Sequence, residues 1–281
     1  EAIRSLVNDK RDWADSRLLR TMCTGEPYSI PRLGDEETVD KLQALRLYDQ
    51  YRDLITTAPL EIIYSGSAEL DRVRQALAAA FATLPREEVR TIADAVPHVC
   101  RESVQTVEDE MEVTQGKLSM GFSCGSDDMP ALLLGNTLFG GSSNSKLFLN
   151  VREKLSLCYY ASSMYHRQKG IITVSSGIEF QNYRRAYDEI LSQLAAVQNG
   201  ELEEWELAGA RSTLLNSYAT VGDSQGKLEN FYLGQAATGR SETPADLAQA
   251  VMEVSAERIC RAMSTVKLDT VYFLKGKEAQ A

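Results

Sequence analysis

Alternation of apolar and acidic residues in one stretch is the feature that most restricts the fold of this chain. Val107, Met111 and Val113 are interleaved with glutamates, and residues 118–122 continue the same period of two. This period separates side chains onto the two faces of a β-strand, so strand structure is predicted from 107 to 122. Further β-rich runs lie at residues 157–165, 171–178 and 268–274, and the first two flank a predicted hairpin turn at 166–170.

Segments with helical periodicity surround these strands. Helices are predicted at 2–23, 35–51, 67–84 (capped by Ser67), from Met129 to the glycines at 140–141, 146–154, 180–198, 202–221 and 224–238, with short helices after Thr243-Pro244 and Ser255 and a short strand at 60–64. Strands followed by helices, without strict alternation, predict the α+β class. We expect a two-layer sandwich in which helices cover one face of a mainly antiparallel sheet.

The polar, irregular stretch at 86–105, which contains Pro97, is interpreted as a linker. It divides the chain into a first domain at 1–95 and a second at 96–281. Both halves end in helices and a strand, which predicts a duplicated α+β fold whose first copy is truncated. The chain starts without Met, directly in a predicted helix, so we expect a preceding piece.

Composition excludes several classes of partner. A formal net charge of −10 in 281 residues disfavours binding to nucleic acid or to an anionic membrane. The longest strongly apolar stretch, 76–84, is far shorter than the roughly 20 residues of a membrane span, and the first residues show no signal peptide. The five cysteines are scattered and form no Cys-x-x-Cys motif, which favours reduced thiols in the cytoplasm.

The stretch from Leu138 to Ser163 carries the most chemistry. A segment of small residues, predicted to be a flexible loop (Gly140, Gly141, Ser142, Ser143), leads into a helix with Arg152 and then into a strand with Tyr159. A helix end followed by a strand start can place both side chains around one pocket. A guanidinium and a phenol there are suited to holding a peptide carbonyl. The alternative is a surface salt bridge beside a core aromatic residue.

This stretch resembles the insulinase/pitrilysin/mitochondrial processing peptidase family, whose second domain carries Gly-Gly-x-x-Ser followed by Leu-Phe-x-x-Val-Arg-Glu-Lys-x-Gly-Leu-x-Tyr. Arg152 and Tyr159 match the family's substrate-holding pair, and Ser156 stands where a Gly is common. Glu26-Pro-Tyr is similar to the family's His-Pro-Tyr loop, with Glu26 in place of His, and residues 62–66 are similar to its Val-Val-Gly strand. The resemblance extends over nearly the whole chain.

Active members of that family bind zinc through an H-x-x-E-H motif on a helix. The two histidines here, His98 and His166, lie far apart in the sequence, and we expect both to be solvent-exposed. The acidic residues at 108–112 split between two strand faces and are interpreted as a solvated surface. We therefore expect no catalytic residue, no metal ligand and no cofactor in this chain, with zinc only in a partner or in an upstream domain.

The resemblance implies a non-catalytic domain that binds peptide substrate and helps to form a chamber with an H-x-x-E-H partner subunit. Such a protein would be bacterial and cytoplasmic and would work as a heterodimer. Two alternatives remain open at this point. The chain is either the C-terminal portion of an active zinc metallopeptidase whose motif lies upstream of residue 1, or a structural scaffold without a ligand.

Overall fold

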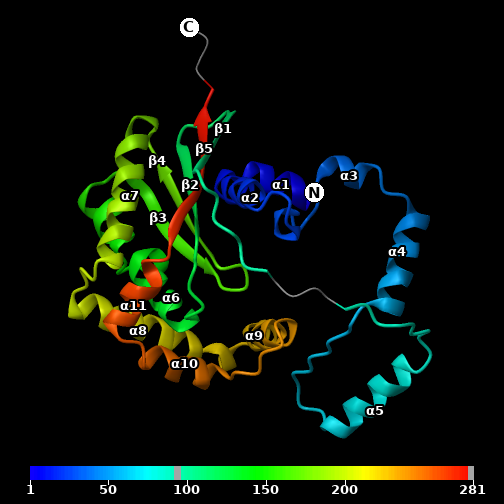
Figure 1. The fold of residues 1–281 in the computed structure, drawn as a ribbon. Coiled ribbons are helices and arrows are strands. Elements are labelled where there is room, and N and C mark those ends of the chain that lie inside the picture. Colours follow the sequence, from blue (N-terminus) through cyan, green and yellow to red (C-terminus); the bar gives the residue numbers. More distant parts are fainter. Residues whose placement is uncertain (92–95, 278–281) are drawn as a thin grey trace. The chain divides into compact units, whose positions relative to one another are not determined.

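The computed structural model describes residues 1–91 and 96–277, and residue contacts divide the chain into two compact units (Figure 1). Unit 1 comprises residues 1–34, 96–219 and 243–281, and unit 2 comprises residues 35–95 and 220–242. The first 34 residues thus pack with segments that follow residue 95. The domains predicted from the sequence, 1–95 and 96–281, were defined as two copies of one fold. The division into compact units rests on contacts and not on repetition, so these domains stay a prediction.

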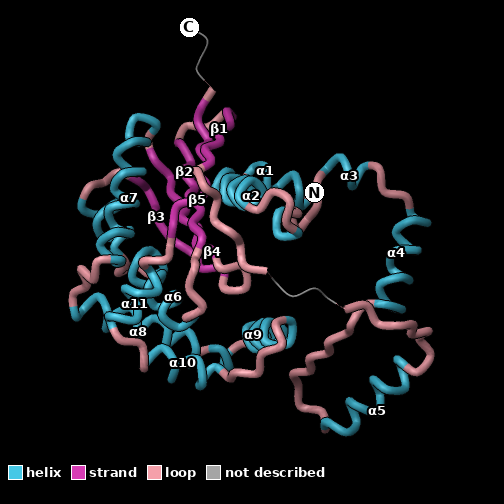
Figure 2. The backbone as a smooth tube through the Cα atoms, viewed as in Figure 1, coloured by secondary structure: helices cyan, strands magenta, loops and turns pink. Residues whose placement is uncertain are grey.

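Unit 1 is built on one five-stranded sheet in the order β1-β5-β2-β4-β3 (Figure 2). The strands are β1 (Gln105–Met111), β2 (Gly116–Ser123), β3 (Cys158–His166), β4 (Ile171–Ile178) and β5 (Lys267–Gly276). The β1–β5 pair is parallel, and the other three pairs are antiparallel. The predicted α+β class with a mainly antiparallel sheet is confirmed.

Helices cover the face of this sheet that carries the main hydrophobic core (Figure 1). They are α6 (Met129–Asn136), α7 (Tyr183–Gln198) and α11 (Ala256–Met263), the π-helical segments η2 (Thr137–Gly141) and η3 (Leu147–Lys154), and the associated α8 (Glu204–Ala219) and α10 (Pro244–Met252). Leu118, Met120 and Phe122 point from β2 into this core and are fully buried. Their alternation in the sequence is therefore the signature of this face.

The N-terminal helices lie on the opposite face of the sheet. The predicted helix 2–23 is divided into α1 (Ala2–Asn8) and α2 (Lys10–Met22), because Asp9 is extended and its carboxylate caps α2 by accepting the amides of residues 11 and 12. Helix α2 packs on β2 and β5 through Leu18 and Met22. A Cβ at Gly121 would lie 2.6 Å from the Met22 sulfur, so a small β2 residue is needed there. The sequence predicted helices on one face of the sheet, and α2 adds helix contacts on the other face.

Asp15 is a partly buried carboxylate on α2, and its Oδ1 accepts the Ser119 hydroxyl at 2.8 Å. Burial raises the pKa of Asp15, although that hydrogen bond opposes the shift. The native state therefore binds this proton more tightly than the unfolded chain, and stability falls as pH rises through the native pKa. Asp15→Asn keeps the acceptor and removes the partly desolvated charge, so we expect a higher Tm at pH 7 and a smaller gain at pH 4.

Thermal melts of Asp15→Asn and the wild type at both pH values measure this effect. Asp12→Asn is the matched control, because Asp12 is an exposed carboxylate on the same helix and should give no gain. A Tm for Asp15→Asn at or below that of the wild type at pH 7 would contradict the expectation.

Unit 2 contains α3 (Glu36–Asp40), α4 (Ala44–Thr57), α5 (Leu70–Phe81), η5 (Val221–Asp223) and α9 (Gln225–Ala237). The predicted strand at 60–64 is wrong, because its residues have no strand neighbour among the described residues and Ile62 and Tyr64 are exposed. The predicted cap is also wrong, since α5 begins at Leu70, after Glu69. Unit 2 shows no sheet in its described residues, so the duplication of the fold stays a prediction.

The predicted linker is irregular where the structure describes it. Residues 86–91 and 96–104 contain neither helix nor strand, and residues 92–95 lie outside the described residues. No helix within the described ranges is both long enough and apolar enough to cross a membrane.

Candidate functional site

Arg152 and Tyr159 line one pocket of unit 1, with a volume of about 410 Å³. Arg152 comes from η3 and Tyr159 from the start of the edge strand β3. The remaining lining comes from Glu153, the segment Ser156–Cys158 and Glu179. The two predicted residues therefore meet at one cavity, as the helix-to-strand spacing indicates, while their role in binding stays a prediction.

The contacts of Arg152 hold its guanidinium at the pocket wall. Its Nε donates to the main-chain carbonyl of Tyr159 at 3.0 Å, and its Nη1 lies 3.0 Å from a carboxylate oxygen of Glu153. The guanidinium carbon lies 4.6 Å from the ring centroid of Phe148, in cation–π range. The arginine thus contacts the backbone of Tyr159 and not its phenol.

The phenol of Tyr159 has a different partner. Its hydroxyl donates to Glu179, and this hydrogen bond is the main cause that raises the pKa of Tyr159. Glu179 was not singled out from the sequence. Glu179 directly follows β4, whose Ile178 pairs with Cys158. The antiparallel register of the predicted hairpin could therefore have placed Glu179 next to Tyr159. Tyr159 as a whole residue is 52% exposed and is therefore accessible to a ligand.

Ser156 connects Arg152 to Tyr159 through an uncommon backbone conformation. Its φ of 50° lies in the left-handed region that favours glycine. The amides of Ser156 and Leu157 donate back to the carbonyls of Arg152 and Val151 and end the helix. This geometry explains why glycine suits the position, and serine holds it here at a steric cost.

The small residues before η3 do not all lie in a loop. Gly140 and Gly141 form the end of η2, Gly140 is buried, and Ser142 and Ser143 follow the helix. The loop assignment of the two glycines is therefore corrected. A Cβ at Gly140 would lie 2.8 Å from the backbone nitrogen of Ser163, so glycine permits close packing against β3. The role of this segment beside a substrate stays a prediction.

A sequence model described as "Peptidase M16 inactive domain" matches residues 41–214. This range covers more than half of the chain and includes both Arg152 and Tyr159. The chain belongs to the peptidase M16 inactive-domain family. The predicted resemblance to a metallopeptidase family, in its non-zinc form, is confirmed.

Relatives of this M16 chain agree with that assignment. The "Probable inactive metalloprotease YmfF" of Bacillus subtilis (strain 168) is 35% identical over 284 residues, which covers 99% of this chain and 66% of the relative. A conserved protein from Enterococcus faecalis V583 superposes with a TM-score of 0.88 at 26% identity, covering 100% of this chain and 67% of that one. A peptidase M16 inactive domain from Pseudomonas fluorescens shares the fold, with a TM-score of 0.80 at 16% identity and coverage of 100% and 69%.

Membership in the inactive M16 family means that this chain carries no catalytic zinc. The prediction that both histidines are solvent-exposed is wrong. His98 is buried between Glu26 and Asp269, with ring nitrogens at 2.7 Å and 3.2 Å from their carboxylates. His166 is partly buried and contacts the hydroxyl of Tyr28 at 2.9 Å. Tertiary contacts between distant segments, which the local sequence does not display, create both environments.

Proposed function

We propose that this chain is the substrate-binding, non-catalytic part of an M16-type peptidase assembly, in which a zinc-bearing H-x-x-E-H partner performs the cleavage. The observation that carries the proposal is the single pocket shared by Arg152 and Tyr159. Membership in the inactive-domain family supports a role outside the chemical step.

The chemistry of the pocket suits a peptide backbone. A guanidinium offers five N–H donors, more than the contacts to Tyr159 and Glu153 use. The phenol can donate to a carbonyl when it exchanges its contact with Glu179. Tyr159 lies at the start of β3, an edge strand of the sheet, and Arg152 reaches its carbonyl from η3. An extended peptide passing this edge would meet both donors.

Exposed apolar side chains in unit 2 support a partner protein or domain. Helix α4 exposes Leu47, Tyr51 and Leu54 at helical spacing, each more than half accessible. Such a stripe on one helix face is typical of a surface that another protein segment covers. Together with the family assignment, it favours assembly with a catalytic M16 subunit as a heterodimer.

The same proposal places the assembly in the cytoplasm of a bacterium. All five cysteines are free, which suits a reducing compartment. The relatives described above are bacterial. A net charge of −10 disfavours nucleic acid as a ligand of the chamber.

Arg152→Ala is expected to weaken peptide binding by roughly 1.5–3 kcal/mol, because it removes hydrogen bonds from a charged group. Tyr159→Phe should cost less, since it removes one hydroxyl and keeps the ring. Folding should change little in either variant, because both side chains are substantially exposed. Fluorescence anisotropy with a mixed-sequence peptide library, in the presence of the zinc-bearing partner, measures the effect.

Arg184→Ala is the matched control, since Arg184 is an exposed arginine paired with Asp188 within α7. It should bind peptide like the wild type, and thermal melts should confirm the fold of every variant. Wild-type binding by Arg152→Ala would return the pair to a structural role and favour the scaffold alternative.

The purified chain alone is expected to cleave no peptide. The reason is the missing H-x-x-E-H motif, without which no water is activated by a helix-bound zinc. Peptidase assays of this chain, with and without EDTA, should show no chelator-sensitive product, whereas the reconstituted pair should show it. Chelator-sensitive cleavage by a verified pure chain would overturn the proposal.

A further inference from the structure

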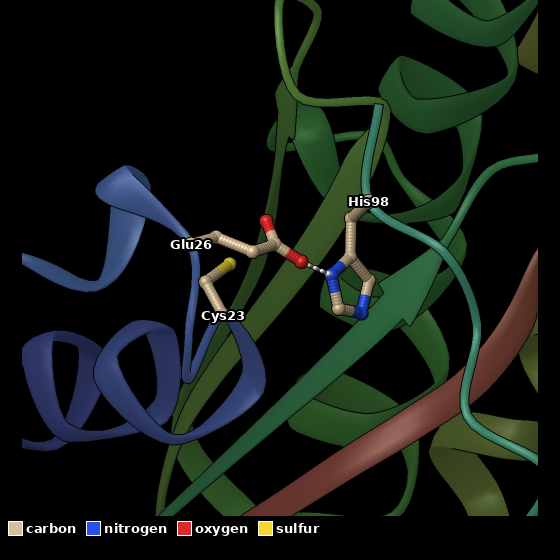
Figure 3. Close-up of side chains that lie close together, drawn as sticks. All are labelled: Cys23, Glu26 and His98. Carbon is tan, nitrogen blue, oxygen red and sulfur yellow. Dashed lines mark hydrogen bonds and ion pairs between the residues drawn. The ribbon is translucent and has the colours of Figure 1, made fainter. Parts of the chain in front are cut away.

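Three side chains of metal-binding type from separate segments meet in unit 1. Cys23 directly follows α2, Glu26 precedes the short helix η1 (Pro27–Ser29), and His98 comes from the segment before β1. The sulfur, a carboxylate oxygen and a ring nitrogen lie within 4.8 Å of one another, and the three side chains converge on one point (Figure 3). We propose that they bind one transition-metal ion of the zinc type, with a structural role.

The surroundings of His98 resemble those of a metal-binding imidazole. Its Nε2 lies 3.2 Å from Oδ2 of Asp269, a fully buried carboxylate that also accepts the Arg101 amide at 2.8 Å. Asp269 is an acceptor, so this contact assigns a proton to Nε2 and leaves Nδ1 as the ligand atom. A carboxylate behind a histidine orients the ring in many metal sites and raises its basicity. The remaining nitrogen faces Glu26 at 2.7 Å.

The carboxylate of Glu26 is already positioned for an ion, because one of its oxygens lies 2.7 Å from Nδ1 of His98. On binding, Cys23 would enter as a thiolate and release its proton to solvent. The ammonium of Lys169 binds the other carboxylate oxygen of Glu26, which leaves the oxygen that faces His98 available to the metal.

The chief rival interpretation is a Cys–His–Asp nucleophile, and the structure disfavours it. Burial, and next the charge of Glu26, raise the pKa of the Cys23 thiol to about 11. The residue is also 0% exposed, so substrate cannot reach the sulfur. A metal ion reverses this situation, because coordination deprotonates a thiol.

The donor set indicates which ion fits. One sulfur, one imidazole nitrogen and one carboxylate oxygen form a mixed set that suits Zn²⁺ better than hard cations such as Mg²⁺ or Ca²⁺. The Glu26 side chain is 27% exposed, so the site opens to solvent on that side and leaves a fourth position for water. A bound ion would tie the end of α2 to the segment that leads into β1.

Zinc binding to the metal-stripped full chain tests the proposal. We expect one equivalent of Zn²⁺ by isothermal titration calorimetry, and Co²⁺ should give a sulfur-to-metal charge-transfer band in the near ultraviolet. Cys23→Ser should abolish that band and weaken zinc binding by more than about 10-fold, because loss of an outer-shell partner of a ligand already costs about that much. Glu26→Gln should weaken binding without removing the band.

Cys260→Ser is the matched control, because Cys260 is a half-buried free cysteine on α11, and it should bind both metals like the wild type. Circular dichroism checks the fold of each variant, and Glu26→Gln decides the outcome if Cys23→Ser fails to fold. No stoichiometric binding by the wild type, or unchanged binding by Glu26→Gln together with Cys23→Ser, overturns the site. These results are independent of peptide binding at Arg152.

Discussion

Lys146→Met is expected to lower the free energy of unfolding by about 3–5 kcal/mol, the cost of leaving one partner of a buried ion pair without its counter-charge. The Lys146 ammonium lies 3.0 Å from both carboxylate oxygens of Glu206, and the two side chains are only 9% and 7% exposed. Glu206 also accepts the amide of Glu203 at 2.9 Å and so helps to begin α8. Urea unfolding monitored by circular dichroism measures the loss.

The double variant Lys146→Met/Glu206→Leu separates pairing from burial. Because it removes both charges, we expect it to recover most of the stability lost by Lys146→Met, at about the level of a neutral replacement. Arg184→Ala, at an exposed pair, should change the free energy of unfolding by less than about 0.5 kcal/mol. A Lys146→Met variant within 1 kcal/mol of the wild type would show that water or a rearranged side chain compensates Glu206.

Gly140→Ala is expected to destabilise the protein by about 3 kcal/mol, at the upper end of the usual cost of overpacking. The added Cβ would lie 2.7 Å from a methyl carbon of Leu147 and 2.8 Å from the backbone nitrogen of Ser163. The latter atom belongs to β3 and cannot rotate away, so η2 or the strand has to shift. Peptide binding at the pocket should weaken as well, because β3 also carries Tyr159.

Gly209→Ala is the matched control for this substitution. Its Cβ would meet its nearest atom, Nδ2 of Asn144, at 3.8 Å, which is ordinary contact, and Gly209 lies within α8. Replacing a helical glycine by alanine stabilises by about 0.5–1 kcal/mol. If Gly140→Ala unfolds at the same urea concentration as the wild type, the close packing of η2 on β3 is not a constraint on the fold.

Local patterns predicted the elements of unit 1 well. The short-range alternation at 107–122 and the apolar run at 171–178 became β1, β2 and β4. Strands β2 and β4 place residues in the main core, and β1 packs Val107 and Met111 against the smaller cluster beneath α2. Asp128, Thr243 and Ser255 cap α6, α10 and α11, as side chains of this type do for adjacent amides. These signals are carried by neighbouring residues and need no tertiary contact.

Unit 2 was predicted less well. The apolar residues at 60–64 have strand propensity, but a strand also requires a neighbour to complete its hydrogen bonds. The described residues of unit 2 provide none, and the segment stays irregular. Propensity alone could not report this, because the missing partner is not a property of the segment itself.

The candidate pocket was predicted in part. Arg152 and Tyr159 are seven positions apart, and a helix end and a strand start lie between them, so the meeting of their side chains is a local consequence of the chain. Glu179 reaches the same pocket only because β3 pairs with β4. The predicted hairpin implied this pairing, but the sequence analysis did not identify Glu179. The spacing of the two residues could not predict that Arg152 contacts the carbonyl of Tyr159 and not its phenol.

The sequence by itself determined the fold class, the family and the absence of the H-x-x-E-H motif, because these are encoded in residue types and short spacings. Only the tertiary structure decided that α2 covers the second face of the sheet and that His98 is buried with Glu26 and Asp269. Those residues are 72 and 171 positions from His98. The physical reason is that burial and the choice of partner for a polar side chain depend on which distant segments pack around it, and no local pattern carries that information.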